Sequence, residues 1–413
     1  MTHLFSAKID GSSFLNVLKE KMRILYLTNK PIFPIVDGGC KAMHQFLKCL
    51  IQCDYTIEHI CLSTHKHTFD LENYPKSILD KIPTSSFDVD TRIKLLPALK
   101  SFFNRKSFVV SRFDDAAVHS KLEVLFSQEE FTHVILESLF TTQYIEAIRK
   151  HTDAKIILRT HNVEHKIWNQ LALNSSNPFK RIYFKRLSED LKKYEIDCLK
   201  KVDFISAITE EDLSVFEELG ITTPKTVIPI ALDLSENLVD YSVSNLFFIG
   251  SMNWKPNIEA VRWLVNEILP NVKVIHPHIE VHLAGSYMEN QFPTDGLKGI
   301  VNHGFVSDSH KFMQNNGLLI SPIKSGSGVR VKLLEAMALG VPVVTTKIGA
   351  TGIQKNNSVY LAETTAEFVS QIIELIKYQE KRMALGEKAR KFIEDNNSVK
   401  SISNYLNDRI SEL

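Results

Sequence analysis

The chain has 413 residues, of which 44% are hydrophobic and 23% are charged. That length corresponds to roughly two or three domains, and the composition is that of a globular protein, which excludes disordered and fibrous chains. Lysine and arginine number 49 against 48 acidic residues, so the net charge of +1 gives no reason to expect a nucleic-acid partner.

Neither a membrane span nor a secretion signal is expected. No apolar run approaches the ~18 residues that a span needs, and the N-terminus lacks a charged segment followed by an apolar one. We therefore expect a cytoplasmic protein. The five cysteines are odd in number and include no C-x-x-C pair, so the sequence predicts neither a disulfide framework nor a zinc site.

Short apolar segments alternate with helical patterns along the first 230 residues. The first segment, RILYLT at 23–28, leads into a loop with glycine and then a helix-period stretch from Lys41 to Leu50. Further strands are expected near 56–62, 91–95, 132–136, 155–159, 203–208 and 225–229. This alternation is typical of a parallel sheet covered by helices on both faces.

The alternation restarts after a polar stretch at 230–244, which we interpret as a linker. The second half predicts strands at 245–250, 280–285, 317–322 and 341–346, and helices at 256–269, 329–339 and within 364–412. Two such units suggest two Rossmann-like lobes that face a cleft. The expected organisation is an N-terminal extension (1–21), a first lobe (22–239), a second lobe (240–395) and a C-terminal helix (396–413) that packs back on the first lobe.

The densest group of candidate residues lies within 321–352. Gly326 and Gly328 allow a ligand to approach the main chain, and a helix begins near Val329 with its free N–H groups. Arg330 and Lys332 add positive charge where the helix dipole disfavours it, so an anion such as a phosphate is expected there. A solvated helix start with incidental charges is the alternative.

Several ordered segments resemble the family-4 glycosyltransferases of the GT-B fold. The longest is GSGVRVKLLEAMALGVPVVTT at 326–346, followed by KIGATGI, and it is similar to that family's nucleotide-sugar signature. The other segments are RILYLTNKPIFPIVDGG (23–39), RTHNVEH (159–165), SAITEEDLSVFEELG (206–220), VIPIALD (227–233), FIGSMNWKPNIEAVRWL (248–264) and HGFVSD (303–308). The resemblance implies a metal-independent, retaining enzyme whose second lobe binds the nucleotide sugar and whose first lobe binds the acceptor.

The resemblance also implies roles for individual residues. It assigns catalysis to a histidine near the transferring sugar and to two cations that stabilise the leaving diphosphate, namely His161, Arg330 and Lys255. It assigns donor binding to glycine loops, a base-reading loop, a cation and a ribose-binding glutamate, namely Gly38, Gly39, Gly304, Phe305, Val306, Gly326, Ser327, Gly328, Lys332 and Glu335. A helix-capping role for His161 is the alternative that the residues alone leave open.

Two positions depart from the family's pattern. Many relatives carry a second glutamate eight residues before the ribose-binding one, where this chain has Ser327. The arginine that commonly follows the glycine at 250 is Ser251. The alternatives to a glycosyltransferase are a GT-B nucleotide-sugar epimerase and a non-catalytic nucleotide-sugar-binding subunit.

No cofactor or metal is expected, because the sequence has no cluster of histidines and cysteines and protein cations replace Mg²⁺ in the family. The expected partners are a nucleotide diphosphate sugar and a glycan or lipid-linked acceptor. The basic, acid-free stretch 92–112, with Phe102, Phe103 and Phe108, favours contact with anionic membrane or an acceptor loop. A second basic segment, 178–201, also contains acids and favours a helix packed on the lobe with a solvated face.

Overall fold

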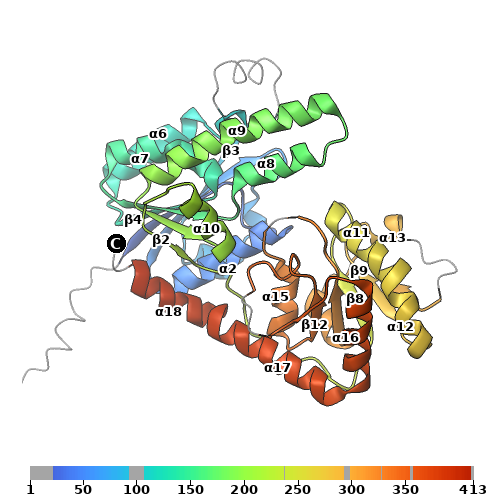
Figure 1. Cartoon of the computed structure of the whole chain (residues 1–413). Coiled ribbons are helices and arrows are strands. Elements are labelled where there is room, and N and C mark those ends of the chain that lie inside the picture. Colours follow the sequence, from blue (N-terminus) through green and yellow to red (C-terminus); the bar gives the residue numbers. More distant parts are fainter. Residues whose placement is uncertain are drawn as a thin grey trace, which may run out of the picture.

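The computed structural model describes residues 22–92, 107–236, 238–292, 298–326, 328–353 and 357–410. These residues form two α/β lobes, each built on one sheet whose strands all run parallel (Figure 1). The strand order is β3-β2-β1-β4-β5-β6-β7 in the first sheet and β10-β9-β8-β11-β12-β13 in the second. The expected architecture of two Rossmann-like lobes is confirmed.

The strands of the first sheet are β1 (Arg23–Thr28), β2 (Thr56–Thr64), β3 (Thr84–Val89), β4 (His133–Glu137), β5 (Lys155–Thr160), β6 (Phe204–Ala207) and β7 (Lys225–Val227). Those of the second sheet are β8 (Leu246–Ile249), β9 (Val281–Ala284), β10 (Ile300–Asn302), β11 (Leu318–Ser321), β12 (Val343–Thr345) and β13 (Tyr360–Leu361).

The helices of the first lobe are α2 (Gly38–Gln52), η1 (Leu71–Asn73), α3 (Lys76–Leu79), α5 (Phe108–Ser111), α6 (Ala116–Gln128), η2 (Leu139–Tyr144), α7 (Ile145–His151), α8 (Glu164–Leu173), α9 (Pro178–Lys201) and α10 (Glu210–Glu218). The others are α11 (Lys255–Trp263), η3 (Leu264–Ile268), α12 (Leu269–Ile275), α13 (Met288–Gln291), α14 (Ser309–Asn316), α15 (Val331–Ala338), α16 (Thr365–Lys377), α17 (Gln379–Asn396) and α18 (Val399–Ile410).

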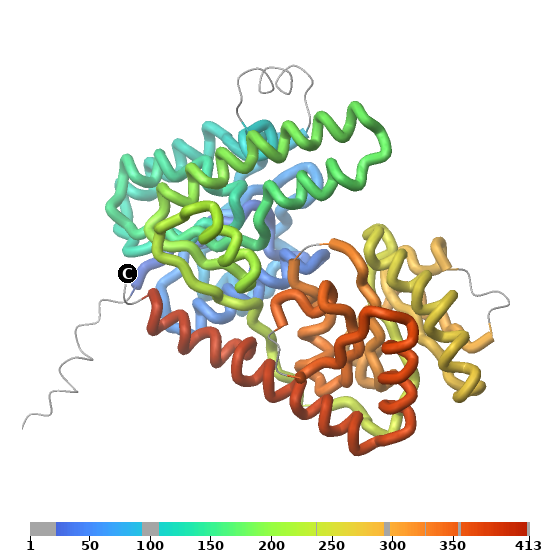
Figure 2. The backbone as a smooth tube through the Cα atoms, in the orientation of Figure 1, coloured from blue at the N-terminus to red at the C-terminus, as the bar shows by residue number. Residues whose placement is uncertain are grey.

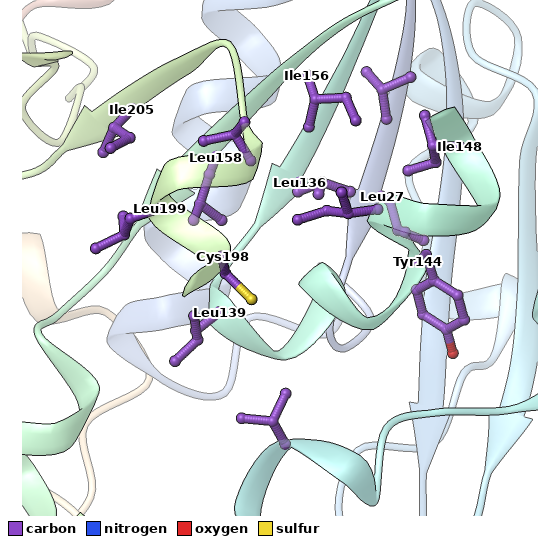
Figure 3. Close-up of a cluster of buried hydrophobic side chains, with 14 of the residues drawn as sticks. Leu27, Leu136, Leu139, Tyr144, Ile148, Ile156, Leu158, Cys198, Leu199 and Ile205 are labelled. Carbon is purple, nitrogen blue, oxygen red and sulfur yellow. The ribbon is translucent and has the colours of Figure 1, made fainter. Parts of the chain in front are cut away.

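Successive side chains of a strand point to opposite sides of the sheet, and apolar clusters cover both sides. On β1, Leu25 and Leu27 join an apolar cluster with residues of α6, α7 and α9, whereas Ile24 and Tyr26 join another with residues of α2 and α18. Figure 3 shows part of the first cluster, where Leu136 and Leu158 lie near Cys198 of α9. The near-continuous apolar runs of these strands follow from this double burial.

One expected strand was placed wrongly. The sequence predicted a strand at 91–95, but the edge strand β3 ends at Val89, and residues 93–95 lie outside the described part. The segment TSSFDV is half polar because an edge strand is only partly covered, so it lacks the apolar run that marked the central strands. The edge strands β10 and β13 were also missed; they span only three and two residues.

Two chain segments cross between the lobes side by side. The first follows β7, and the second joins α17 to α18. Leu232 N donates to Asn397 O at 2.7 Å, and Val399 N donates to Leu232 O at 3.1 Å. Beyond this crossing α18 lies along the first lobe (Figure 2), where Tyr55 donates to Asn407 Oδ1 at 2.8 Å. The last helix therefore ties the two lobes together.

Within the described residues, no helix combines the length and the apolar character that a membrane span requires.

Candidate active site

The candidate site lies where loops of the two lobes meet at the carboxyl ends of the parallel strands. A Cβ atom placed on Gly328 would lie 2.9 Å from Asn162 Oδ1, and one on Gly38 would lie 3.5 Å from Val331 Cγ2. Lys41 of α2 forms an ion pair with Glu335 of α15. The fold thus brings the glycine loop, the segment after β5 and the signature helix of the second lobe to one place, as open α/β folds do with their ligands.

His161 follows β5 directly and is held by a buried charged group. The Glu137 carboxylate at the end of β4 contacts both His161 Nε2 and Arg159 Nη1, and Tyr26 donates to its other oxygen at 2.7 Å. Glu137 and Arg159 are fully buried, and His161 keeps about a sixth of its side chain exposed, 17%. The imidazole is therefore anchored from behind by a carboxylate and remains accessible.

Glu137 is ionised beside His161. Burial alone would raise the pKa of Glu137, but the charges of Arg159 and His161 outweigh burial and lower it to about 2. A carboxylate only accepts, so Nε2 of His161 donates in its contact with Glu137, and Arg159 Nη1 lies 3.1 Å from the same ring nitrogen. The other ring nitrogen of His161 is Nδ1.

In the second lobe, Arg330 is folded against its own glycine turn. Gly326 and Gly328 have φ of +98° and +79°, which strongly favour glycine. Arg330 Nη1 donates to Gly328 O at 2.5 Å, and its guanidinium lies 5.0 Å from the centre of the Trp254 ring. Burial lowers the pKa of Arg330 to about 10, so it remains a cation at neutral pH. Ser327, between the two glycines, lies outside the described residues.

Lys332 is the second cation at this turn. Its Nζ lies 3.0 Å from Asn257 Oδ1 and 3.8 Å from the centre of the Phe248 ring. Neither group neutralises an ammonium. Burial, and then the charge of Arg330, lower the pKa of Lys332 well below its ordinary value. An anion bound beside Arg330 and Lys332 would relieve this cost.

Lys255 is placed differently from Lys332. It begins α11 with 78% of its side chain exposed, and its Nζ lies 3.5 Å from Glu259 Oε1. The basic residue packed next to Arg330 is therefore Lys332, to which the resemblance assigned donor binding.

Glu335 lies on the first turns of α15 and is nearly buried. Besides its ion pair with Lys41, its Oε1 lies 3.4 Å from His310 Nε2. Burial lowers the pKa of Lys41. A ribose that binds Glu335 must therefore compete with the Lys41 ammonium from the other lobe.

The two remaining loops are also positioned by local contacts. Asp37 caps α2 by accepting from Cys40 N at 2.8 Å and pairs with Lys30, which holds Gly38 and Gly39 at the helix start. Gly304 has a φ of +59° and donates to Asn302 Oδ1 at 2.9 Å. Phe305 is 74% exposed beside it, and Val306 packs on the second-lobe core.

Sequence reasoning missed Glu137, Lys41 and Asn257. A signal for Glu137 was present, because it ends the apolar run HVILE just as Arg159 nears the end of KIILR, and the two are partners in the ladder between β4 and β5. Lys41 and Asn257 had no comparable signal, since their partners lie far away along the chain.

A cavity of about 960 Å³ also lies between the lobes, at another place. It is lined by Thr209 and Pro229 of the first lobe, by residues of 347–361, and by Asn397 and Tyr405 near the crossing. None of the predicted site residues that the structure describes lines it. We therefore place the candidate site at the contacts around Glu335 and His161 instead.

Sequence comparisons identify the second lobe. Residues 244–378 match the family model described as Glycosyl transferases group 1. A sequence relative is an uncharacterized 44.6 kDa protein in the cps region of Klebsiella pneumoniae. It is 26% identical over 298 residues, which make up 68% of this chain and 75% of that protein.

Solved structures share the two-lobe fold. Anabaena HepE in complex with UDP superposes with a TM-score of 0.66 at 15% identity, over 95% of this chain and 100% of that one. Sucrose-phosphate synthase from Thermosynechococcus elongatus gives 0.66 at 11% identity, over 94% and 98% of the two chains. A TarM variant of S. aureus in complex with UDP gives 0.64 at 12% identity, over 94% and 99%.

These likenesses confirm the GT-B fold for this chain. Together with the family match of the second lobe, they support a glycosyltransferase of that fold.

Proposed function

We propose that this chain is a retaining family-4 glycosyltransferase that moves a hexosyl group from a nucleotide diphosphate sugar to an acceptor hydroxyl. The observation that carries the proposal is the pair of basic side chains at the glycine turn, the buried Arg330 and the half-buried Lys332, whose Nζ contacts the Asn257 amide and the Phe248 ring. UDP in the HepE and TarM complexes makes a uridine nucleotide the first donor to test. The cps-region relative supports a role in cell-surface polysaccharide or glycolipid synthesis.

In this proposal the second lobe stabilises the leaving group. Negative charge grows on the diphosphate as the sugar–phosphate bond breaks, and pre-placed cations stabilise that charge without reorganising. Arg330 and Lys332 fill this role, so the transfer needs no metal ion. Lys255 can join them only by leaving Glu259.

The first lobe supplies His161 to the sugar or the acceptor. Glu137 holds the ring through Nε2, so Nδ1 can accept a hydrogen bond from a hydroxyl. Glu137 is a positioning residue, because its carboxylate is fully buried behind the imidazole.

The experiment is a measurement of nucleotide diphosphate released from a panel of donors, each with and without oligosaccharide or lipid-linked acceptors, in the presence of EDTA. A glycosyltransferase releases the nucleotide in an acceptor-dependent way, and NMR of the product tests retention. Acceptor-independent release with a sugar changed in configuration would establish the epimerase instead. A donor-induced thermal shift without turnover would establish a binding subunit; a ligand at 100 times its Kd adds about 2.7 kcal/mol of stability.

The role of His161 is tested by His161→Ala, with the exposed His278→Ala as the matched control. His161→Ala should reduce transfer by about 10²–10⁴-fold if the imidazole takes part in proton transfer, and leave the thermal shift by UDP unchanged. Glu137→Gln should lower kcat while donor binding remains, and long-range ¹H–¹⁵N NMR should show His161 in a changed tautomer. If His161→Ala transfers sugar at the full rate, His161 has a structural role and no role in catalysis.

A further inference from the structure

The hairpin formed by α8 and α9 projects from the first lobe (Figures 1 and 2) and carries an exposed apolar cluster at its tip. Phe179 is 82% exposed, Ile182 67% and Leu173 57%; Leu171 and Tyr183 are exposed as well. Large exposed apolar groups that gather in one place mark an interaction surface, whereas single ones need no explanation. We call Leu171, Leu173, Phe179, Ile182 and the basic residues between them the hairpin tip.

The base of the hairpin is packed normally. Leu187, Leu191 and Cys198 of α9 are buried in the first-lobe core, as the packed-helix interpretation of this segment expected. Glu195 of α9 accepts from Glu164 N at 3.0 Å and contacts His165 Nδ1 at 2.6 Å, which fixes the start of α8. The exposure at the tip is therefore a property of the tip and not of a loosely packed helix.

The tip is also held in shape. Asn177 caps α9 by accepting from Phe179 N at 2.9 Å and Lys180 N at 3.1 Å, and Pro178 occupies the first turn. Phe179 and Ile182 thus belong to a preformed start of the helix, so the main chain that carries them needs no ordering when a partner binds.

The positive charge of the hairpin tip favours an anionic partner. No aspartate or glutamate occurs between Lys166 and Ser188, and Lys180, Arg181 and Lys185 are all exposed beside Phe179 and Ile182. A second copy of this surface would bring like charges together. A bilayer with anionic headgroups accepts apolar side chains at its boundary and attracts the cations around them.

We infer that the hairpin tip docks the first lobe onto an anionic lipid surface. Phe179 and Ile182 enter the headgroup boundary, and Lys180, Arg181 and Lys185 contact the phosphates. The stretch 92–112, for which the sequence also predicted a membrane contact, is described only in part. Phe108 is buried in the first-lobe core, and Arg112 donates to Thr91 O at 2.8 Å, whereas residues 93–106 lie outside the described part.

The test is flotation of the full chain with vesicles of phosphatidylcholine that contain one third phosphatidylglycerol, compared with vesicles of phosphatidylcholine alone. The chain should float with the anionic vesicles and lose binding as salt rises. Lys180→Gln/Arg181→Gln should weaken binding by roughly fivefold per removed charge. Phe179→Ser/Ile182→Ser should abolish the binding that persists at high salt.

Two matched pairs serve as controls. Lys192→Gln/Lys193→Gln removes exposed charges from the same helix, and Val274→Ser/Ile275→Ser removes exposed apolar groups from α12 of the second lobe. Both should float like the unchanged chain, and every variant should keep its thermal shift with UDP. No flotation of the unchanged chain, equal losses in the controls, or lipid-free self-association abolished by Phe179→Ser/Ile182→Ser would overturn the proposal. These outcomes are independent of sugar transfer.

Discussion

The two lobes bury cations in opposite ways. In the first lobe, Arg159 is fully buried beside Glu137, so its counter-ion belongs to the protein. In the second lobe, Lys332 is half-buried against an amide oxygen and a ring, and it shares the site with Arg330. A buried charge costs much less free energy when an opposite charge is beside it. The first arrangement includes its own counter-ion, and in the proposed function an anionic ligand supplies one for Lys332.

This difference separates a positioning role from a binding role. The pair of Glu137 and Arg159 shapes the surroundings of His161 and meets no further anion. In the proposed function, Arg330 and Lys332 stabilise the negative charge of a diphosphate. Replacing Arg159 should therefore lower the stability of the free protein. Replacing Lys332 should raise that stability and weaken donor binding.

The largest effect is expected from Arg159→Met, which leaves the Glu137 carboxylate buried without its arginine. Breaking a buried ion pair on one side costs about 3–5 kcal/mol of unfolding free energy. Urea denaturation measures this loss. The double variant Arg159→Met/Glu137→Met should recover most of it, because the stranded charge is gone. A loss below about 1 kcal/mol in the single variant would mean that the pair does not stabilise the lobe.

Arg330→Ala should act on turnover more than on stability. Its guanidinium meets charge that grows in the transition state, and removing such a group lowers kcat by about 10²–10³-fold. Steady-state kinetics with a UDP-sugar measures the change, and Lys324→Ala, an exposed cation of the same loop, is the control. A raised KM at unchanged kcat would make Arg330 a ground-state anchor instead.

Glu335 and Lys41 should shift donor affinity in opposite directions. Glu335→Ala leaves ribose hydroxyls without an acceptor, at about 1–3 kcal/mol of binding free energy. Lys41→Met removes the ammonium that occupies Glu335, so it should tighten donor binding. Calorimetry with UDP measures both. If both variants bind UDP like the unchanged chain, the ribose does not contact Glu335.

In the candidate site, the sequence predicted which residues lie together better for the second lobe than for the first. GSGVRVKLLEAMA concentrates its glycines, cations and glutamate on one turn and one helix, so local spacing alone places them together. In the first lobe, His161 depends on Glu137, which lies on another strand, and only the order of strands brings them into contact. A sequence shows which residues lie at the end of a strand. Which strand lies beside it is known only from the order of strands in the complete sheet.

The same limit applies to the proposed lipid-binding surface. The stretch 92–112 and the segment 178–201 both combine basic and aromatic residues, and charge counts favoured the first. Phe108 is buried and Phe179 is exposed, and the sequence alone does not show which aromatic side chain reaches solvent.

The smallest effect, and the most direct test of the comparison, is expected from Lys332→Met. Removing a buried ammonium should raise the unfolding free energy of the free protein, on the order of 1 kcal/mol, where Arg159→Met lowers it. The sign depends on pH. Because the folded pKa of Lys332 lies below 10.5, the folded state binds fewer protons than the unfolded state between the two values, so stability rises with pH there. The cost is therefore fully present below the lowered pKa, and the gain from Lys332→Met should fade as pH rises towards 10.5.

Donor binding should reverse this cost. A bound diphosphate raises the pKa of Lys332, so UDP binding should take up a fraction of a proton at a pH between the free and bound values. Calorimetry in two buffers of different ionisation enthalpy measures this uptake, and Lys332→Met should lack it while also binding UDP more weakly. If Lys332→Met destabilises the free protein or binds UDP unchanged, the ammonium is a packed structural cation like Arg159, and the contrast between the lobes does not hold.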